Sequence, residues 1–506
     1  MATDKHIVLV PMIMWGHTRP MCTFAARIVK LRPAMLVTMF VSEGFYERAK
    51  AEIALEFQSG QEHLQSRITL IRLTRATSPW DSATYEADFL DTWANFSSGQ
   101  PLCGYEANGN PRQVDPSERD RFAAAVIDIF AIGAFDTFRK IKETTGLKVY
   151  SWFPAALTCM FKWFGTDIIP TVREYASRTG VSFDVAAHEV LVVPKGELVD
   201  SPCLPKMYDY EYHPQAAFTS VEFTGHTVVH VNRVLRETDG LVTIDAADYI
   251  TPRTSEAVRT WFGERPVYFA GPLVSPVRAS PDAFAKPEAA SIKRFLDDRM
   301  ASHGAKSVML ISFGSMFWPT NAAKVGAVLN VLMEKNVPFI LSRPTSAAQI
   351  PEDVTTKLAE CENVYIANWV PQQLVLSHPA TGWCLTHAGL NSTFECIFAS
   401  VPMITWPIDA DQPPNVINLT DELKVAYELL EGRDGYGLGM IHRTGVTPRG
   451  TISAVEDELR DVLVRAFGAD GLAKRARLHE LKAKLQKAWE VGGPAREGVE
   501  TLLDGM

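Results

Sequence analysis

The sequence lacks the patterns that mark several classes of protein. Its seven cysteines are scattered and form no C-x-x-C pair, which favours reduced thiols over a disulfide framework or a cysteine-rich zinc site. No apolar run reaches the roughly 18 residues of a membrane span. The first apolar strand begins at His6, too close to the start for a signal peptide before it. We therefore expect a cytoplasmic protein with no membrane span.

Further absences narrow the function. The chain has 50 Lys and Arg against 59 Asp and Glu, a net charge of −9, without a long basic run. Neither nucleic acid nor an anionic membrane is therefore an expected partner. No G-x-G-x-x-G follows the strands expected at 6–11 and 307–313, which counts against an NAD(P)-dependent oxidoreductase. No repeat of about 20–50 residues is visible.

What the sequence does contain is an alternation of short apolar strands and helices over 506 residues. This length exceeds one typical core, and the alternation predicts doubly wound α/β domains. We expect a first domain over 1–270 and a second over 291–491. A stretch rich in Pro, Ala and Ser over 271–290 is the expected linker between them.

One stretch, 369–412, holds most of the candidate chemistry. A strand is expected at 383–386, a turn at 387–389, and a helix opened by the Asn, Ser and Thr of 391–393. The N–H groups and the dipole at such a helix start form an anion site, which the His and Gly of the turn would complete for a diphosphate. The polar residues of 409–412 follow the next strand, at the edge of a parallel sheet where ligands bind.

This stretch resembles the donor-binding box of the family 1 glycosyltransferases, UDP-sugar-dependent enzymes of plants and fungi. The match runs without a gap from Trp369 to Gln412, although Leu390 stands where the family usually has Trp. The resemblance implies the α/β fold called GT-B, in which two doubly wound, Rossmann-like domains face one another across a cleft. It also implies a first domain that binds the acceptor, a second that binds the UDP-sugar, and a terminal helix at about 492–506 that packs back on the first.

The resemblance further implies a role for each residue of the box. Trp369 would stack on uracil, Gln372 would bond the uridine, and Glu395 would bond the ribose hydroxyls. Asp411 and Gln412 would bond the sugar, and Gln412 favours glucose. The diphosphate would be bordered or held by Gly314, Ser315, His387, Gly389, Asn391 and Ser392.

Two residues outside the box match the family's catalytic pair. His17 follows the first strand, where the family has its general base, and His is the side chain whose ordinary pKa of about 6.5 lies near neutrality. Asp128 closes a later strand and would orient His17 by a hydrogen bond. Alternatively, Asp128 only caps the helix that follows, and Asp136 in that helix is the second candidate for the partner of His17.

Asp409, Ala410 and Asp411 have the D-x-D form of a metal-binding motif found in another class of glycosyltransferase. We interpret this match as coincidence, because a helix N-terminus and His387 would already neutralise the diphosphate. No metal and no other cofactor is expected, and the UDP-sugar is a co-substrate.

Candidate residues for binding the acceptor lie outside the box. The stretch 75–116 contains many aromatic residues, among them Trp80, Tyr85, Phe89 and Trp93. They would either line a pocket for a flat apolar acceptor or form the small core of a surface excursion. We expect a second excursion beside the acceptor site within 164–212. The expected acceptor is a small phenolic, terpenoid or polyketide-like molecule.

Together these features predict an inverting UDP-glycosyltransferase that uses UDP-glucose and forms a β-O-glycoside on a small apolar or aromatic acceptor. The alternative is a UDP-sugar-binding protein without turnover. Such a protein would keep the donor box and lose the base, and the presence of His17 and Asp128 argues against it.

Overall fold

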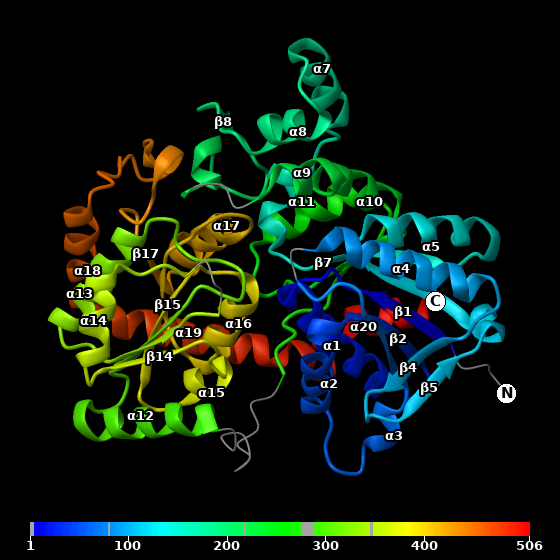
Figure 1. The fold of residues 1–506 in the computed structure, drawn as a ribbon, viewed down its shortest axis with the longest axis horizontal. Coiled ribbons are helices and arrows are strands. Elements are labelled where there is room, and N and C mark those ends of the chain that lie inside the picture. Colours follow the sequence, from blue (N-terminus) through cyan, green and yellow to red (C-terminus); the bar gives the residue numbers. More distant parts are fainter. Residues whose placement is uncertain (1–4, 79–80, 216–218, 276–286, 345–347) are drawn as a thin grey trace. The chain divides into compact units, whose positions relative to one another are not determined.

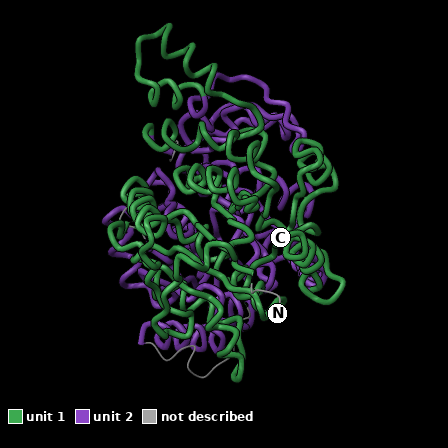
Figure 2. The backbone as a smooth tube through the Cα atoms, turned by 90° about the vertical axis from the view of Figure 1, so that its right-hand side faces the viewer, with its two compact units in different colours: residues 1–190, 221–276, 487–506 green, residues 191–220, 277–486 purple. Residues whose placement is uncertain are grey.

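The computed structural model describes residues 5–78, 81–215, 219–275, 287–344 and 348–506. The chain divides into two compact units. Unit 1 comprises residues 1–190, 221–276 and 487–506, and unit 2 comprises residues 191–220 and 277–486 (Figure 2). Each unit is therefore assembled from stretches that are distant in the sequence.

Unit 1 is built on a nine-stranded sheet (Figure 1). Its strands are β1 (His6–Val10), β2 (Leu36–Ser42), β3 (Ile68–Leu73), β4 (Leu102–Glu106), β5 (Pro111–Val114), β6 (Phe122–Asp128), β7 (Lys148–Phe153), β10 (Gly240–Thr243) and β11 (Val267–Phe269). Their order is β11-β10-β7-β6-β1-β2-β3-β4-β5. Neighbours from β11 to β3 pair in parallel, and β4 and β5 are antiparallel. The parallel strands are nearly continuous apolar runs because helices cover both of their faces.

Helices lie on both faces of this sheet. Three of them, α4 (Ser82–Ser97), α5 (Ile132–Thr145) and α10 (Val231–Glu237), share one apolar core with the strands. On the other face lies α1 (Trp15–Leu31), whose Phe24 ring is 5.4 Å from the ring of Trp152 in β7. The remaining helices are α2 (Tyr46–Leu55), α3 (Glu62–Gln65), α6 (Met160–Phe164), α7 (Ile169–Thr179), α8 (Phe183–Leu191), α9 (Val221–His226), α11 (Pro252–Phe262) and α20 (Pro494–Asp504).

Unit 2 has a six-stranded parallel sheet in the order β14-β13-β12-β15-β16-β17. Its strands are β12 (Val308–Ser312), β13 (Phe339–Ser342), β14 (Val364–Ala367), β15 (Thr381–Thr386), β16 (Met403–Thr405) and β17 (Ala426–Glu428), and β8 (Leu198–Val199) and β9 (Met207–Tyr208) pair separately. Its helices are α12 (Pro287–His303), α13 (Ala322–Glu334), α14 (Glu352–Glu360), α15 (Gln372–Ser377), α16 (Leu390–Ala399), α17 (Gln412–Ile417), α18 (Ile452–Ala466) and α19 (Ala469–Gln486).

The helices of unit 2 also cover both faces of their sheet (Figure 1). The apolar sides of α13, α14 and α18 share a core with Met309, Trp383 and Leu385. Cys384 points the other way from β15 and contacts Cys396 of α16, which packs beside α19. Both units are therefore doubly wound α/β structures, as the alternation of strands and helices predicts.

The boundaries between the units differ from those expected. Residues 191–220, placed in the first domain by the sequence analysis, belong to unit 2. They are held there by hydrogen bonds from Tyr210, His213 and Gln215 to groups of unit 2. Within the expected linker 271–290, residues 271–276 belong to unit 1 and α12 begins at Pro287, while 276–286 lie outside the described residues.

Each sheet reverses its winding direction at one place. In unit 1 the chain winds one way from β1 to β3 and the other way from β6 to β11, so the loops after β1 and β6 diverge. In unit 2 the corresponding reversal lies between β12 and β15. Open parallel sheets bind their ligands at the carboxyl ends of the strands at such a point. These two places are therefore the first in which to look for a functional site.

Candidate active site

In unit 1, His17 and Asp128 meet at the reversal between β1 and β6. His17 lies in the first turn of α1, and Asp128 is the last residue of β6. The Nδ1 atom of His17 is 2.9 Å from Oδ2 of Asp128. The other carboxylate oxygen, Oδ1, accepts a hydrogen bond of 3.0 Å from the N–H of Phe130. Asp128 thus bonds both the imidazole and the backbone that follows it.

The two side chains differ in exposure. Asp128 is completely buried, whereas 15% of the His17 side chain is exposed. A carboxylate only accepts hydrogen bonds, so Nδ1 of His17 carries the hydrogen and a neutral imidazole keeps its lone pair on Nε2. The ring of His17 also stacks on Phe130 at 5.7 Å. His17 is thus held in an orientation in which Nε2 can take a proton from another molecule.

The second candidate for the partner of His17 is engaged elsewhere. Asp136 accepts two hydrogen bonds, of 2.6 and 3.1 Å, from the guanidinium of Arg233. The geometry therefore favours Asp128.

The start of α1 also differs from expectation. The sequence predicts a turn over 12–18 and a helix over 20–30. The helix instead begins at Trp15 and contains Pro20, at the loss of the backbone hydrogen bond that a proline cannot donate. His17 is consequently on a helix, which fixes its backbone.

In unit 2, His387 stands at the reversal between β12 and β15. It follows β15 directly and is 6% exposed. A Cβ atom added to Gly314 would lie 2.8 Å from Nε2 of His387, and one added to Gly389 would lie 2.6 Å from the same atom. A side chain at either glycine would therefore crowd the imidazole ring. The sequence does not reveal this relation between three predicted residues.

Burial determines the charge of this histidine. It lowers the pKa of His387 from 6.5 to about 4, although a backbone hydrogen bond at Ser312 acts in the opposite direction. At pH 7 the ligand-free side chain is therefore neutral and offers an N–H group rather than a positive charge. The N–H group of a neutral ring can still donate to a diphosphate, so the role expected for His387 stays a prediction.

The helix α16 provides the other part of the predicted anion site. Its N-cap is Gly389, and Asn391 and Ser392 lie inside its first turn rather than before it. Glycine has no side chain that could bond the first N–H groups of the helix. These N–H groups and the helix dipole thus provide a partial positive charge beside Gly389, where an anion is stabilised.

The predicted nucleoside-binding residues form one hydrogen-bonded network. Nε2 of Gln372 donates to Oγ of Ser392 at 3.2 Å and to Oε2 of Glu395 at 2.6 Å. Ser312, which the sequence analysis missed, donates to Oε1 of Gln372 at 2.9 Å. Its only signal was its position at the end of β12, before the predicted Gly314. Trp369 is 44% exposed after β14, so one large aromatic surface remains available for stacking.

The predicted sugar-binding residues lie in a tight loop, 407–412. Oε1 of Gln412 accepts from the N–H of Ile408 at 2.8 Å and from the N–H of Asp409 at 3.2 Å. Ala410 has a positive φ of 61°, which the turn imposes on it. Gln412 thus shapes the loop with its oxygen.

Asn415, which the sequence analysis also missed, joins this loop to the turn at His387. Its Nδ2 donates to Oδ2 of Asp411 at 3.0 Å and to the carbonyl of Ala388 at 2.9 Å. Ser315, the remaining predicted donor residue, is exposed after β12. Unit 2 thus brings the predicted donor residues to the carboxyl edge of its sheet.

Within the D-x-D sequence, Asp409 is paired with a histidine. Oδ1 of Asp409 is 3.0 Å from Nδ1 of His213, and both side chains are buried. In the described ranges no group of three or more His, Cys, Asp or Glu residues could hold a metal ion. None of the described helices combines the length and the apolar character that a membrane span needs.

The aromatic acceptor pocket predicted on α4 is wrong for three of its residues. Tyr85, Phe89 and Trp93 are 2%, 1% and 4% exposed, and they pack in the core between α4 and the sheet. Their spacing of four residues places them on one face of the helix. Tyr85 donates a hydrogen bond of 2.8 Å to the carbonyl of Pro11. Trp80, the fourth predicted residue, lies outside the described residues.

Known proteins resemble this chain in sequence. A model of the family described as UDP-glucoronosyl and UDP-glucosyl transferase matches residues 263–427. The UDP-glycosyltransferase eriJ of Hericium erinaceus is 30% identical over 525 residues, which cover 99% of this chain and 98% of the relative. The hydroquinone glucosyltransferase of Rauvolfia serpentina is 25% identical over 97% of this chain and 99% of the relative.

Solved structures resemble it in fold. UGT2 of Phytolacca americana, in complex with UDP-2fluoro-glucose and pterostilbene, has a TM-score of 0.65 at 20% identity and covers 99% of both chains. UGT71G1 of Medicago truncatula, in complex with UDP-glucose, has a TM-score of 0.65 at 19% identity over 99% of this chain and 98% of that one. The predicted GT-B fold is confirmed by this likeness.

Proposed function

Because the chain belongs to the UDP-glycosyltransferase family, we propose that it transfers glucose from UDP-glucose to a hydroxyl of a small apolar or aromatic molecule. The product is a β-O-glycoside with inverted configuration at the anomeric carbon. The observation that chiefly supports catalysis, as opposed to binding alone, is the 2.9 Å contact between His17 and Asp128. It provides a partly exposed base at the carboxyl edge of the sheet in unit 1.

In the proposed reaction, Nε2 of His17 takes the proton of the acceptor hydroxyl while the oxygen attacks the anomeric carbon of the α-linked donor. The bond between that carbon and the phosphate oxygen breaks, and UDP leaves with the electron pair. Asp128 keeps the imidazole in the correct tautomer and stabilises the imidazolium that forms. One displacement of this kind inverts the configuration.

The donor is proposed to bind in unit 2. Trp369 stacks on uracil, and Gln372 and Glu395 bond the nucleoside. The N–H groups at the start of α16 and the neutral N–H of His387 stabilise the developing charge on UDP. No metal is proposed, because these groups can stabilise that charge. Relatives solved with UDP-glucose and with UDP-2fluoro-glucose support a nucleotide-sugar donor.

The acceptor is proposed to be a phenolic, terpenoid or polyketide-like alcohol. Support comes from pterostilbene in the complex of UGT2 and from the name of the hydroquinone glucosyltransferase. The finding that Phe89 and Trp93 are core residues removes the predicted acceptor residues on α4. A cytoplasmic location remains part of the proposal, and cell fractionation would test it.

The test is a transfer assay with purified protein, UDP-glucose and pooled phenols and terpenoid alcohols, in the presence of EDTA. We expect a product heavier by one hexose in the mass spectrum and a β-anomeric proton in its NMR spectrum. An α-linked product would contradict inversion, and loss of activity in EDTA that is restored by Mg²⁺ would contradict metal independence. Binding of UDP-glucose with no product from any acceptor class would favour the alternative of a UDP-sugar-binding protein.

A further inference from the structure

We infer that His213 and Gln215 are positioning residues that hold the loop 407–412 in the shape required to bind the sugar of the donor. The inference rests on the proposed function, which assigns this loop to the sugar. Both residues belong to the stretch 191–220, which is distant in sequence from the donor box and yet part of unit 2.

His213 holds the loop from its side. Its Nδ1 lies 3.0 Å from Oδ1 of Asp409, and the two side chains are 2% and 1% exposed. This geometry is close to that of His17 and Asp128, but burial separates the two pairs. An imidazole buried to this extent is inaccessible to an acceptor hydroxyl, so His213 orients Asp409 and does not act as a base.

Gln215 ties the same loop to a second one. Its Nε2 donates to the carbonyl of Pro407 at 2.9 Å, and its Oε1 accepts from the N–H of Thr320 at 2.9 Å. Thr320 lies between β12 and α13, in the loop that begins with Gly314. One buried amide therefore sets the distance between the loop expected to contact the sugar and a loop expected to border the phosphates.

The stretch that presents these residues is closely fitted to unit 2. The carbonyl of Pro214 accepts from the N–H of Asp434 at 2.8 Å, and the hydroxyl of Tyr210 donates to the carbonyl of Met440 at 2.7 Å. A Cβ atom added to Gly437 would lie 2.4 Å from the oxygen of Pro214, and one added to Gly439 would lie 2.5 Å from the ring of Tyr210. Both glycines thus permit the close approach of this stretch.

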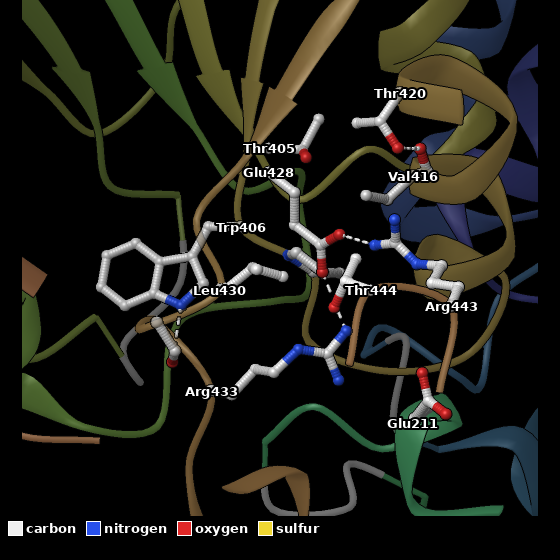
Figure 3. Close-up of polar contacts among 12 residues, drawn as sticks. Glu211, Thr405, Trp406, Val416, Thr420, Glu428, Leu430, Arg433, Arg443 and Thr444 are labelled. Carbon is white, nitrogen blue, oxygen red and sulfur yellow. Dashed lines mark hydrogen bonds and ion pairs between the residues drawn. The ribbon is translucent and has the colours of Figure 1, made fainter. Parts of the chain in front are cut away.

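A buried ion cluster fixes the part of unit 2 that this stretch contacts. Figure 3 shows the carboxylate of Glu428 between the guanidinium groups of Arg433 and Arg443. Removing one partner from such a cluster leaves an uncompensated buried charge, so its members hold one another in place. Oε1 of Glu211 accepts from the N–H of His442 at 3.1 Å and so joins the stretch to the segment that contains Arg443.

These contacts predict an effect on the binding of the donor's sugar. The loop 407–412 is assigned to the sugar, whereas Gln372 and Glu395 of the nucleoside network lie in other elements. Loosening the loop should therefore weaken the binding of UDP-glucose and leave the binding of UDP unchanged. A general loss of structure would weaken both.

The experiment measures the affinities for UDP and UDP-glucose by calorimetry, without acceptor, in His213→Gln and Gln215→Ala. We expect Kd for UDP-glucose to rise about tenfold in both variants, as loss of one buried hydrogen bond implies. Kd for UDP should stay within about twofold in His213→Gln, and in Gln215→Ala it should rise less than Kd for UDP-glucose, because Gln215 also bonds the loop expected to border the phosphates. His213→Asn, whose amide can reach the place of Nδ1, should restore affinity. His226→Gln, at an exposed histidine of unit 1, is the matched control and should change nothing.

Equal losses for UDP and UDP-glucose, or no loss for either, would overturn the inference. If the wild type binds no UDP-glucose, the proposed function fails, and hydrogen exchange then decides the inference separately. Deuterium uptake at 407–412 in the ligand-free protein should rise in His213→Gln and not in His226→Gln. Unchanged uptake in His213→Gln would overturn it.

Discussion

The side chains that matter most are histidines in three different environments. His17 is partly exposed and bonded to a buried carboxylate, His213 is fully buried in a similar pair, and His387 is buried against two glycines. The same residue type can therefore act as a base, as a positioning group or as a neutral donor, because burial and hydrogen-bond partners determine which ring nitrogen another molecule can reach.

The closeness of Gly389 to His387 predicts that a larger side chain at Gly389 acts by crowding the imidazole ring and not by straining the backbone. Gly389 has a φ of −61°, which any residue adopts, so Gly389→Ala adds only a methyl group 2.6 Å from Nε2 of His387. We expect Kd for UDP to rise about tenfold or more, since the buried ring must move out of place. Gly498→Ala, where the added atom meets nothing closer than 3.7 Å, is the control for calorimetry. Equal affinities for the two variants would contradict this.

His387 also predicts a pH dependence of stability. Its pKa is lowered from 6.5 to about 4 in the folded protein, so between these values the unfolded chain binds the proton and the folded chain does not. The contribution of His387 to the free energy of unfolding is therefore complete above pH 6.5. It decreases by about 3 kcal/mol as the pH falls to about 4. Chemical denaturation at pH 7 and pH 4 should show a smaller acid loss in His387→Gln than in wild type. An equal loss in both proteins would refute the assignment.

Among single residues, the contact between His17 and Asp128 was predictable because their spacing matched a known pattern. The roles expected for the donor-box residues stay predictions. Ser312 and Asn415 were missed, since a lone Ser or Asn has no pattern and gains its role from a neighbour in space. The neutral state of His387 was also missed, because burial cannot be read from one position in a sequence.

Among the elements, α4 shows how one pattern supports two interpretations. Aromatic residues four apart lie on one helix face, but the sequence does not say whether that face lines a pocket or the core. Tyr85, Phe89 and Trp93 are buried against the sheet. The strands and helices themselves were largely predictable, because a buried parallel strand is a continuous apolar run.

The position of α4 predicts a loss of stability for Trp93→Ala. Trp93 is 4% exposed, and truncating a buried Trp costs about 3–5 kcal/mol in unfolding free energy. Leu90 lies on the same helix and is 39% exposed. Leu90→Ala should therefore change the free energy of unfolding by less than about 0.5 kcal/mol. Urea denaturation measures both. A stable Trp93→Ala protein with a raised acceptor KM would restore the pocket interpretation.

On the scale of the whole molecule, the two units are not consecutive segments. The stretch 191–220 leaves unit 1 to complete unit 2, and 487–506 leaves unit 2 to complete unit 1. The stretch 191–220 was misplaced from sequence because its ties to unit 2, such as Gln215 to Pro407, join residues that are far apart along the chain. The linker rich in Pro and Ala marks one of the places where the chain passes from one unit to the other. It does not indicate the other places.

The C-terminal helix α20 therefore predicts a loss confined to unit 1. Leu502 is fully buried there, and Trp489 donates a hydrogen bond of 3.1 Å to the carbonyl of Ala270. Leu502→Ala should destabilise unit 1 by about 2–5 kcal/mol, while UDP binding by unit 2 should persist at temperatures where unit 1 has unfolded. Glu497→Ala, at an exposed position of α20, is the control. The measurement is calorimetric unfolding with and without UDP. Unfolding temperatures equal to those of the wild type in both variants would contradict the prediction.

The most direct test of the proposed mechanism is the rate of sugar transfer by His17→Ala at saturating UDP-glucose, with donor affinity measured on the same preparation. Because His17 is proposed to remove the acceptor proton, we expect a kcat at least about 100-fold lower than in wild type with an unchanged donor Kd. A variant that transfers glucose at the rate of the wild type would show that His17 is not the base and would contradict the mechanism.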